Sequence, residues 1–123
     1  MTPVPASNGT LASLVAQLAR RRIPLTMCPL SNLKLQVIPA VAAHPLKRLL
    51  DAGLCVTVNS DDPSYFGGYV NDNLVQVFEA LPTLGPREAY AILRNSFEGA
   101  FVDDDDRRLW IEELDTVFAA REP

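Results

Sequence analysis

Two short apolar runs, separated by a helical segment, constrain the fold more than any other feature of this sequence. The runs are Ile23–Cys28 and Leu54–Val58, and both are nearly continuous in apolar residues. Between them, Pro45–Ala52 has the pattern of a helix, with proline in its first turn and Gly53 as its stop. Continuous apolar strands joined through a helix are typical of a parallel sheet covered on both faces. The sequence therefore predicts an α/β fold.

The remainder of the chain is predicted to be largely helical. Residues 1–10 are rich in Pro, Ser, Asn and Gly and are expected to form a loose arm, while residues 11–123 form the folded segment. Arg20–Arg22 ends the first helix, where basic side chains complement the helix dipole. Asn32–Pro39 alternates in hydrophobicity but has no obvious partner strand. Apolar side chains recur at helical spacing in four sets: Leu11, Leu14, Val15, Leu18; Leu74, Val77, Phe78, Leu81; Tyr90, Leu93, Phe97, Ala100, Phe101; and Leu109, Trp110, Leu114, Val117, Phe118.

Two strands cannot form a self-sufficient parallel sheet, because each needs neighbours on both edges. The chain is therefore expected to be part of something larger. Exposed strand edges would favour association with further strands, either of a second copy or of another polypeptide.

Composition and charge exclude several classes of function. A net charge of −4, from 15 acidic and 11 basic residues, argues against nucleic-acid binding, which needs clustered Lys and Arg. No apolar run approaches the roughly 20 residues that span a bilayer, so no membrane partner is expected. The N-terminus lacks the pattern of a signal peptide. Cys28 and Cys55 form no CxxC pair, which indicates neither a thiolate metal site nor a disulfide framework. These features predict a cytoplasmic protein.

Both predicted strands end in distinctive polar residues, and active sites of α/β folds form at such ends. The second strand runs into Asn59-Ser60-Asp61-Asp62-Pro63. Adjacent carboxylates repel each other unless a cation or hydrogen-bond donors hold them. Alternation along a strand would point Asp61 and Asp62 in different directions, so one could ligate a metal while the other faces a substrate. Alternatively, the pair simply opens a turn before Pro63.

Two blocks of the sequence resemble the last third of the metal-dependent adenosine and adenine deaminases of the amidohydrolase superfamily. They are MCPLSNLKLQV and HPLKRLLDAGLCVTVNSDDP, and SDDPSYFGGYVNDN is similar in particular to the adenine deaminases of bacteria and fungi. The resemblance extends from about Leu11 to the C-terminus. It implies the C-terminal part of a (β/α)8 barrel, with the two predicted strands as the seventh and eighth. Such barrels take about 250 residues, so the chain is expected to be incomplete and inactive alone.

The resemblance also implies roles for the acidic pair. Asp61 matches the aspartate that ligates the catalytic zinc and accepts a hydrogen bond from the attacking water. Asp62 matches the aspartate that binds the purine ring. The implied reaction is hydrolytic deamination of adenine to hypoxanthine and ammonia by a zinc-activated water, with adenosine as the alternative substrate. A non-catalytic oligomerising remnant is the alternative function.

The family's other zinc ligands are histidines from earlier strands, and they are not found here. His44 is the chain's one histidine, and we expect it to cap or pack the helix that follows it. The remaining ligands, and the N-terminal part of the barrel, would therefore have to come from elsewhere. A homo-oligomer is the other expected partnership.

Several other residues have competing structural and functional interpretations. Cys28 is expected to pack in the core, while Ser31 and Asn32 are expected to hold the loop beside the site. Tyr65, Phe66 and Tyr69 either wall a purine pocket, because bases stack on aromatic faces, or pack in a turn. Asp103–Asp106 lacks the spacing of a calcium loop and is expected to cap a helix.

Overall fold

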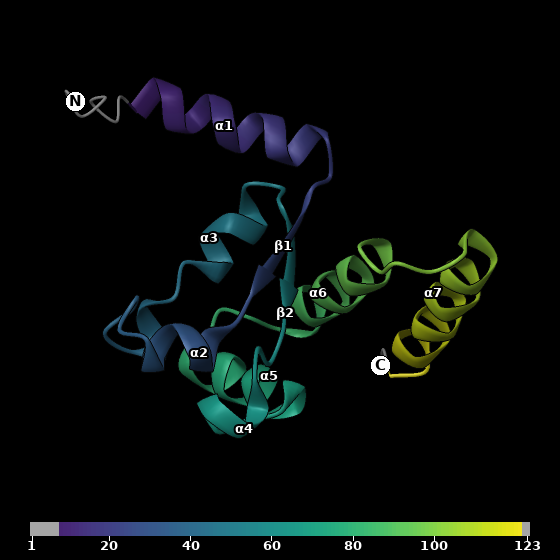
Figure 1. Cartoon of the computed structure of the whole chain (residues 1–123). Helices are drawn as coiled ribbons and strands as arrows, with labels where there is room; N and C mark the ends of the chain where they lie inside the picture. Colours follow the sequence, from purple (N-terminus) through teal and green to yellow (C-terminus); the bar gives the residue numbers. More distant parts are fainter. Residues whose placement is uncertain (1–7, 122–123) are drawn as a thin grey trace.

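The computed structural model describes residues 8–121, which form a mixed α/β arrangement of two parallel strands and several helices (Figure 1). The elements are α1 (Asn8–Arg20), β1 (Pro24–Met27), α2 (Pro29–Lys34), the 3-10 helix η1 (Val41–Ala43), α3 (Leu46–Asp51), β2 (Cys55–Val58), α4 (Pro63–Phe66), α5 (Val70–Ala80), α6 (Pro86–Glu98) and α7 (Asp104–Ala119).

The two strands pair in parallel, in a register that places Pro24 opposite Cys55 and Met27 opposite Val58. The connection between them runs through α2, η1 and α3, as parallel pairing requires. All four residues of β2 are buried, whereas β1 alternates between exposed and half-buried residues. One face of β1 is therefore open in this chain, although its edge toward β2 is paired.

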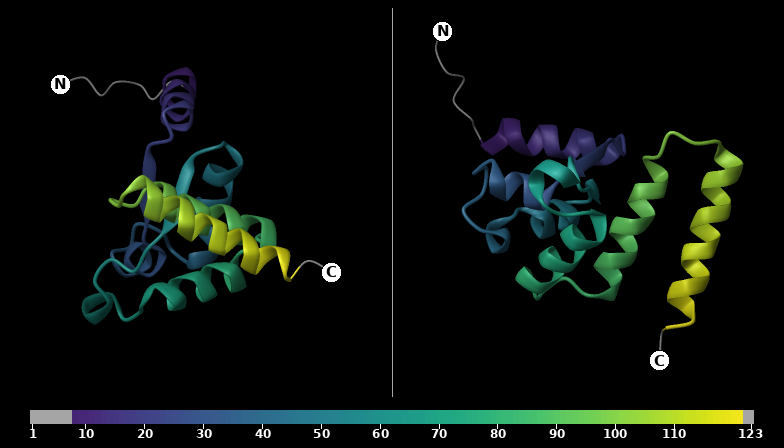
Figure 2. Two further views of the ribbon diagram at one scale, coloured as in Figure 1. Left: turned by 90° about the vertical axis from the view of Figure 1, so that its right-hand side faces the viewer. Right: turned by 60° about the horizontal axis from the view of Figure 1, so that its bottom comes forward.

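The hydrophobic core lies between the strands and the helices that follow them. Its buried members come from α3, β2, α5 and α6 and their connections: Leu46, Leu54, Val56, Val58, Val77, Leu84 and Ile92. Helix α6 packs along β2, and α7 lies antiparallel to α6 on the side away from the strands (Figures 1 and 2). Helix α1 lies across the amino-terminal end of the sheet, with half-buried side chains on the core (Figure 1). The carboxyl ends of both strands consequently face α2, α4 and α5.

The predicted strands and the helix between them are confirmed, with differences at the connections. Helix α1 begins at Asn8, so the described end of the predicted arm is helical; residues 1–7 lie outside the described residues. The segment after β1 was expected to be a loop, but Pro29–Lys34 forms α2. Proline is well suited to the first turn of a helix, which explains this start. Leu35 and Val37 follow α2 as exposed residues of an irregular connection, so their alternation reflects no strand.

Helix α6 buries two different faces, and the predicted apolar stripe accounts for only one of them. Ile92 and Asn95 are its buried residues, and Asn95 Nδ2 donates to the carbonyl of Val56 in β2 at 2.9 Å. The predicted stripe instead faces α7, where the Phe97 ring lies 6.0 Å from that of Trp110. Phe101 lies beyond the helix and is fully exposed, contrary to the prediction.

Asp103–Asp106 lies at the start of α7, as expected, but the side chain of Asp103 makes no capping hydrogen bond. Asp103 occupies the N-cap position. Asp104–Asp106 fill the first turn, where they complement the helix dipole. Two of them also form ion pairs one turn ahead, Asp104 with Arg107 and Asp105 with Arg108. No helix within residues 8–121 is long and apolar enough to cross a membrane.

Candidate functional site

The carboxyl ends of β1 and β2 meet at one cavity of about 520 Å³. The strand pairing continues one step past the ladder, because the Asn59 amide donates to the Met27 carbonyl at 2.8 Å. The two segments therefore leave the sheet at the same level, and the residues that follow them line the same cavity. The lining residues come from both strand ends and from the start of α5: Thr26, Cys28, Asn59, Ser60, Asp61 and Val70.

Asp61 lies in this cavity with an unusual backbone conformation. Its φ of 58° is in the left-handed region, which few residues other than glycine adopt and in which Asp is among the better tolerated. Its Oδ2 accepts a hydrogen bond from the Ser31 hydroxyl at 2.9 Å. The polar residue that sequence reasoning assigned only to the loop beside the site therefore contacts the predicted metal ligand directly.

Asp62 has different hydrogen-bond partners from Asp61, and strand alternation does not apply to the pair. Strand β2 ends at Val58, and Asp62 is the N-cap residue of α4. Its Oδ1 accepts hydrogen bonds from the amides of Ser64 at 3.1 Å and Tyr65 at 3.3 Å. Both bonds end on one oxygen, so the cap does not require the other. The turn-opening interpretation and the binding interpretation are compatible at this residue.

A short polar relay orders the cavity wall beside Asp61. Thr57 Oγ1 donates to the Leu25 carbonyl across the strand pair at 2.7 Å, and Asn59 Nδ2 donates to Thr57 Oγ1 at 2.8 Å. Thr57 is buried, and every member of the relay has a partner. The Asn59 side chain is thereby held at the cavity without a role in the sheet itself.

Further hydrogen bonds join α2 to the segment that follows β2. Asn73 in α5 is fully buried, and its Oδ1 accepts from the Leu30 amide at 3.0 Å. Lys34 donates to the Tyr65 carbonyl at 2.8 Å, and its ammonium lies 5.7 Å from the centre of the Tyr65 ring. Helix α2 and the helices that follow β2 are therefore joined beside the cavity. Sequence analysis missed Asn73; its signal is a polar residue within one turn of Leu74 and Val77, on a face otherwise buried.

The aromatic residues after the acidic pair do not line this cavity. Tyr65 and Tyr69 are 64% and 71% exposed, and Tyr65 packs edge-on against Phe66 with ring centres 4.9 Å apart. Val70 supplies the apolar wall instead. Packing therefore accounts for the Tyr65–Phe66 pair, and the role of the aromatic residues at a purine pocket stays a prediction.

Cys28 lies in the cavity wall, which corrects the expectation that it packs in the core. It is half-buried and forms the N-cap position of α2. Burial raises the pKa of its thiol, and the Asp61 carboxylate raises that pKa further, against a partial lowering by a hydrogen bond with the Asp61 backbone. The thiol therefore stays protonated at neutral pH, which makes it a poor nucleophile.

His44 is a structural residue, as expected. It is buried, and its Nδ1 accepts the amide of Leu46 at 3.2 Å in the first turn of α3. Nε2 must then hold the proton, which it shares with Asn32 Oδ1 at 3.1 Å. Burial lowers the pKa of the imidazole, so the neutral form is favoured. Both ring nitrogens are engaged, so neither can ligate a metal at the cavity.

The described residues offer a metal one carboxylate at this site. A catalytic zinc takes three protein ligands and an open position. Within residues 8–121, no group of three or more His, Cys, Asp and Glu side chains could hold a metal ion. Asp61 fits the role of a single oxygen ligand, and any further ligands would have to come from outside the described residues.

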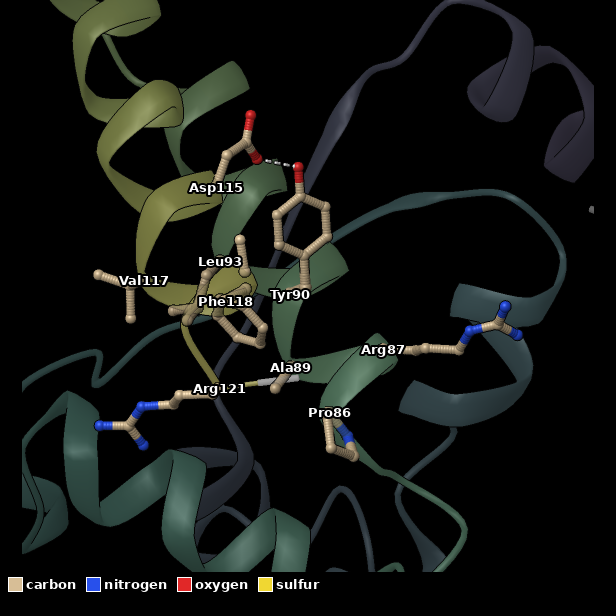
Figure 3. Close-up of a pocket in the computed structure, with 10 residues that line it drawn as sticks. Pro86, Arg87, Ala89, Tyr90, Leu93, Asp115, Val117, Phe118 and Arg121 are labelled. Atoms are coloured by element: carbon tan, nitrogen blue, oxygen red, sulfur yellow. Dashed lines mark hydrogen bonds between the residues drawn. The ribbon is translucent and has the colours of Figure 1, made fainter. Parts of the chain in front are cut away.

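A second cavity, of about 810 Å³, lies between α6 and α7 on the outer side of the molecule (Figure 3). Its walls are mostly apolar, with Leu93 and Phe118 facing each other, and the Tyr90 hydroxyl donates to Asp115 Oδ1. The carboxylate is thus already held by a neighbour. This cavity is larger than the one at Asp61, but it lacks convergent polar groups and lies away from the strand ends.

Comparison with known proteins finds relatives that match most of the chain. The family model described as "Adenosine deaminase" matches residues 9–117. The chain is 56% identical over 105 residues to the adenine deaminase of Geotalea uraniireducens, and 58% identical over 105 residues to that of Albidiferax ferrireducens. Each alignment covers 85% of this chain and 30% of the relative, so the chain spans about a third of the length of these proteins.

Solved structures show the same relationship in three dimensions. The crystal structure of adenine deaminase from Arthrobacter aurescens is 38% identical, with a TM-score of 0.79, over 85% of this chain and 32% of that one. An amidohydrolase from Burkholderia ambifaria, with bound Zn, superposes with a TM-score of 0.71 at 23% identity, over 91% of this chain and 33% of that one.

Proposed function

Because the chain belongs to the adenosine deaminase family, we propose that it is a segment of a purine deaminase that converts adenine to hypoxanthine and ammonia. The observation on which the proposal depends is the position of Asp61. Its carboxylate lies in a cavity at the carboxyl ends of two parallel strands, where α/β folds form their sites.

In this proposal β1 and β2 are the seventh and eighth strands of a (β/α)8 barrel, and the helices after them close it. Two features of the chain support this. The face of β1 that carries Pro24 and Thr26 is exposed, and so are the apolar side chains of Leu11 and Leu14 on α1. In a closed barrel this face of β1 would line the interior, and further elements would cover Leu11 and Leu14.

Asp61 and Asp62 have separate tasks in the proposed reaction. Asp61 would contribute one oxygen ligand to a zinc ion and accept a hydrogen bond from the water that attacks the purine. A zinc ion bound at such a site supplies a water whose pKa is near 7. Asp62 would hold the purine ring with the oxygen that its helix cap leaves available.

Adenosine is the second candidate substrate, because the matching family model is described by that name. The adenine deaminases at 50–58% identity favour adenine. Comparing kcat/KM for the two compounds decides between them.

A graft into a relative tests the proposal. Residues 9–117 of this chain would replace the matching segment of the Geotalea uraniireducens adenine deaminase. We expect the graft to bind zinc and to release hypoxanthine and ammonia from adenine. Asp61→Asn in the graft should lower both zinc content and kcat by more than the about 100-fold upper range seen for residues that only support a ligand. A folded graft with full zinc content that does not deaminate either purine would overturn the proposal.

We propose the remaining part of such a barrel as the partner of this chain, with a homo-oligomer as the alternative. The sheet of the described residues has two strands, so β1 and β2 each have one outer edge at which a partner could add parallel strands. Sedimentation of the full chain, alone and with the N-terminal two thirds of the Geotalea uraniireducens enzyme, separates the two. A complex of the chain with the added fragment supports the barrel partner. A stable oligomer of the chain whose sedimentation does not change when the fragment is added supports the homo-oligomer.

A cytoplasmic location is part of the proposal, since Cys28 and Cys55 are both free thiols. Fractionation of cells expressing a tagged chain tests it.

A further inference from the structure

We propose that Ser31 is the positioning residue of Asp61, and that its hydroxyl fixes the carboxylate in the orientation that binds the metal. This inference rests on the proposed function, because it assigns Asp61 the role of a zinc ligand. Its main evidence is the 2.9 Å hydrogen bond from Ser31 Oγ to Asp61 Oδ2. The donor and the acceptor of this bond also lie in different surroundings.

The serine end of this contact is rigid. Ser31 is 1% exposed and lies in α2, whose first three residues are all buried. The buried Asn73 in α5 accepts a hydrogen bond from the Leu30 amide of α2 at 3.0 Å. Within the first turn, the Asn32 amide donates to the Cys28 carbonyl at 2.7 Å. These bonds hold the backbone that carries the Ser31 hydroxyl in place.

The choice of partner is specific. A serine hydroxyl within a helix ordinarily bonds the carbonyl four residues earlier. Ser96 does so in α6, with Ile92 at 3.1 Å. For Ser31 the corresponding carbonyl is that of Met27, which already accepts the Asn59 amide at 2.8 Å. Ser31 bonds across the chain to a carboxylate instead.

The aspartate end, in contrast, has little else to hold it. Asp61 is exposed and follows the strand in a left-handed backbone conformation, so its side chain would otherwise rotate freely in water. A hydroxyl bond to a carboxylate is charge-assisted and therefore among the stronger hydrogen bonds. Because the bond occupies Oδ2, it leaves Oδ1 for a cation. Holding the carboxylate in advance reduces the rotational entropy lost when a metal binds.

The first arm of the test uses the full chain without metal. NMR couplings between the Asp61 Hα and its two Hβ protons report whether χ1 is fixed. We expect the couplings of a single χ1 rotamer in the unsubstituted chain and rotationally averaged couplings in Ser31→Ala. Ser96→Ala is the matched control, since it removes a hydroxyl that bonds only its own helix. Single-rotamer couplings that survive in Ser31→Ala would overturn the inference.

The second arm uses the graft described above and measures zinc affinity by competition with a chelator. We expect Ser31→Ala to weaken zinc binding and lower kcat by about 10- to 100-fold, the range for residues that support a ligand. KM for adenine should stay close to its original value, because Ser31 is buried and its hydroxyl bonds Asp61. Ser31→Thr, which keeps the hydroxyl, should recover most of the lost affinity.

The two arms separate the inference from the proposed function. Equal zinc affinity in Ser31→Ala and the unsubstituted graft would overturn the positioning role while leaving the deaminase proposal intact. Failure of the unsubstituted graft to retain zinc would overturn the deaminase proposal, while the couplings alone would still decide whether Ser31 fixes Asp61.

Discussion

The guanidinium of Arg22 lies 2.9 Å from Oδ1 of Asn95, and so joins the segment before β1 to the last turn of α6 across 73 positions of sequence. The same side chain donates to the Gly53 carbonyl at 3.2 Å and pairs with Glu98 at 3.1 Å. Asn95 in turn donates to the Val56 carbonyl in β2. One arginine, beyond the last residue of α1, thus connects both strands' amino ends to the helix that covers them.

Arg22→Ala should destabilise the fold measurably. It leaves the buried Asn95 oxygen without its charged donor, which costs about 1–3 kcal/mol. Urea denaturation followed by circular dichroism measures the loss. Arg21→Ala is the matched control, because Arg21 is exposed, and its effect should stay within about 0.5 kcal/mol. Equal effects of the two substitutions would contradict the bridging role of Arg22.

Substitutions of Asp62 can separate its helix cap from its proposed binding role. Asp62→Ala removes the acceptor for the Ser64 and Tyr65 amides and should cost about 1 kcal/mol of stability, whereas Asp62→Asn keeps an acceptor and should cost little. In the graft, Asp62→Asn should nevertheless raise KM for adenine, because the negative charge is lost. A fully active graft with Asp62→Asn would limit this residue to capping.

The single histidine should make stability depend on pH in a defined direction. Burial lowers the folded-state pKa of His44, so below about pH 6.5 the unfolded chain binds a proton that the folded chain resists. The contribution of His44 is therefore complete above that pH and is lost as the pH falls toward the lowered pKa. NMR titration of the one imidazole should give a value below 6.5.

His44→Asn is the control for this pH dependence. Its side-chain oxygen can still accept the Leu46 amide, but it does not titrate in this range. The difference in unfolding free energy between pH 7.5 and 5.5 should shrink in this variant. An imidazole pKa at or above its ordinary value would contradict the buried, neutral histidine.

The two thiols should react with alkylating reagents at clearly different rates. Cys55 is fully buried and Cys28 is half-buried, so Cys28 should be labelled first and Cys55 only on unfolding. Burial raises the pKa of both thiols, so labelling of the folded chain at pH 7–8 should be slower than that of an exposed cysteine. Mass spectrometry of the labelled peptides distinguishes the two sites. Faster labelling of Cys55 than of Cys28 in the folded chain would contradict the structure.

The sequence by itself determined both strands and most of the helices, and it led to the proposal of a site after β2. Apolar runs, helical spacing and proline at helix starts were sufficient to predict both strands, the helix between them and the later helices. The acidic pair after β2 marked the strand end, because two adjacent carboxylates are costly without a binding or capping role. The predictions for His44 and for the start of α7 followed from the same local rules.

The tertiary structure decided which side chains meet, because those contacts depend on how distant segments pack. No local pattern links Ser31 to Asp61, Asn73 to Leu30 or Arg22 to Asn95, since each pair is separated by at least 30 residues. The same reason explains the errors: Cys28 was predicted to be core because its own segment is apolar, and the stripe of α6 faces α7 because β2 occupies the other side. Periodicity identifies an apolar face, whereas only packing determines what covers it.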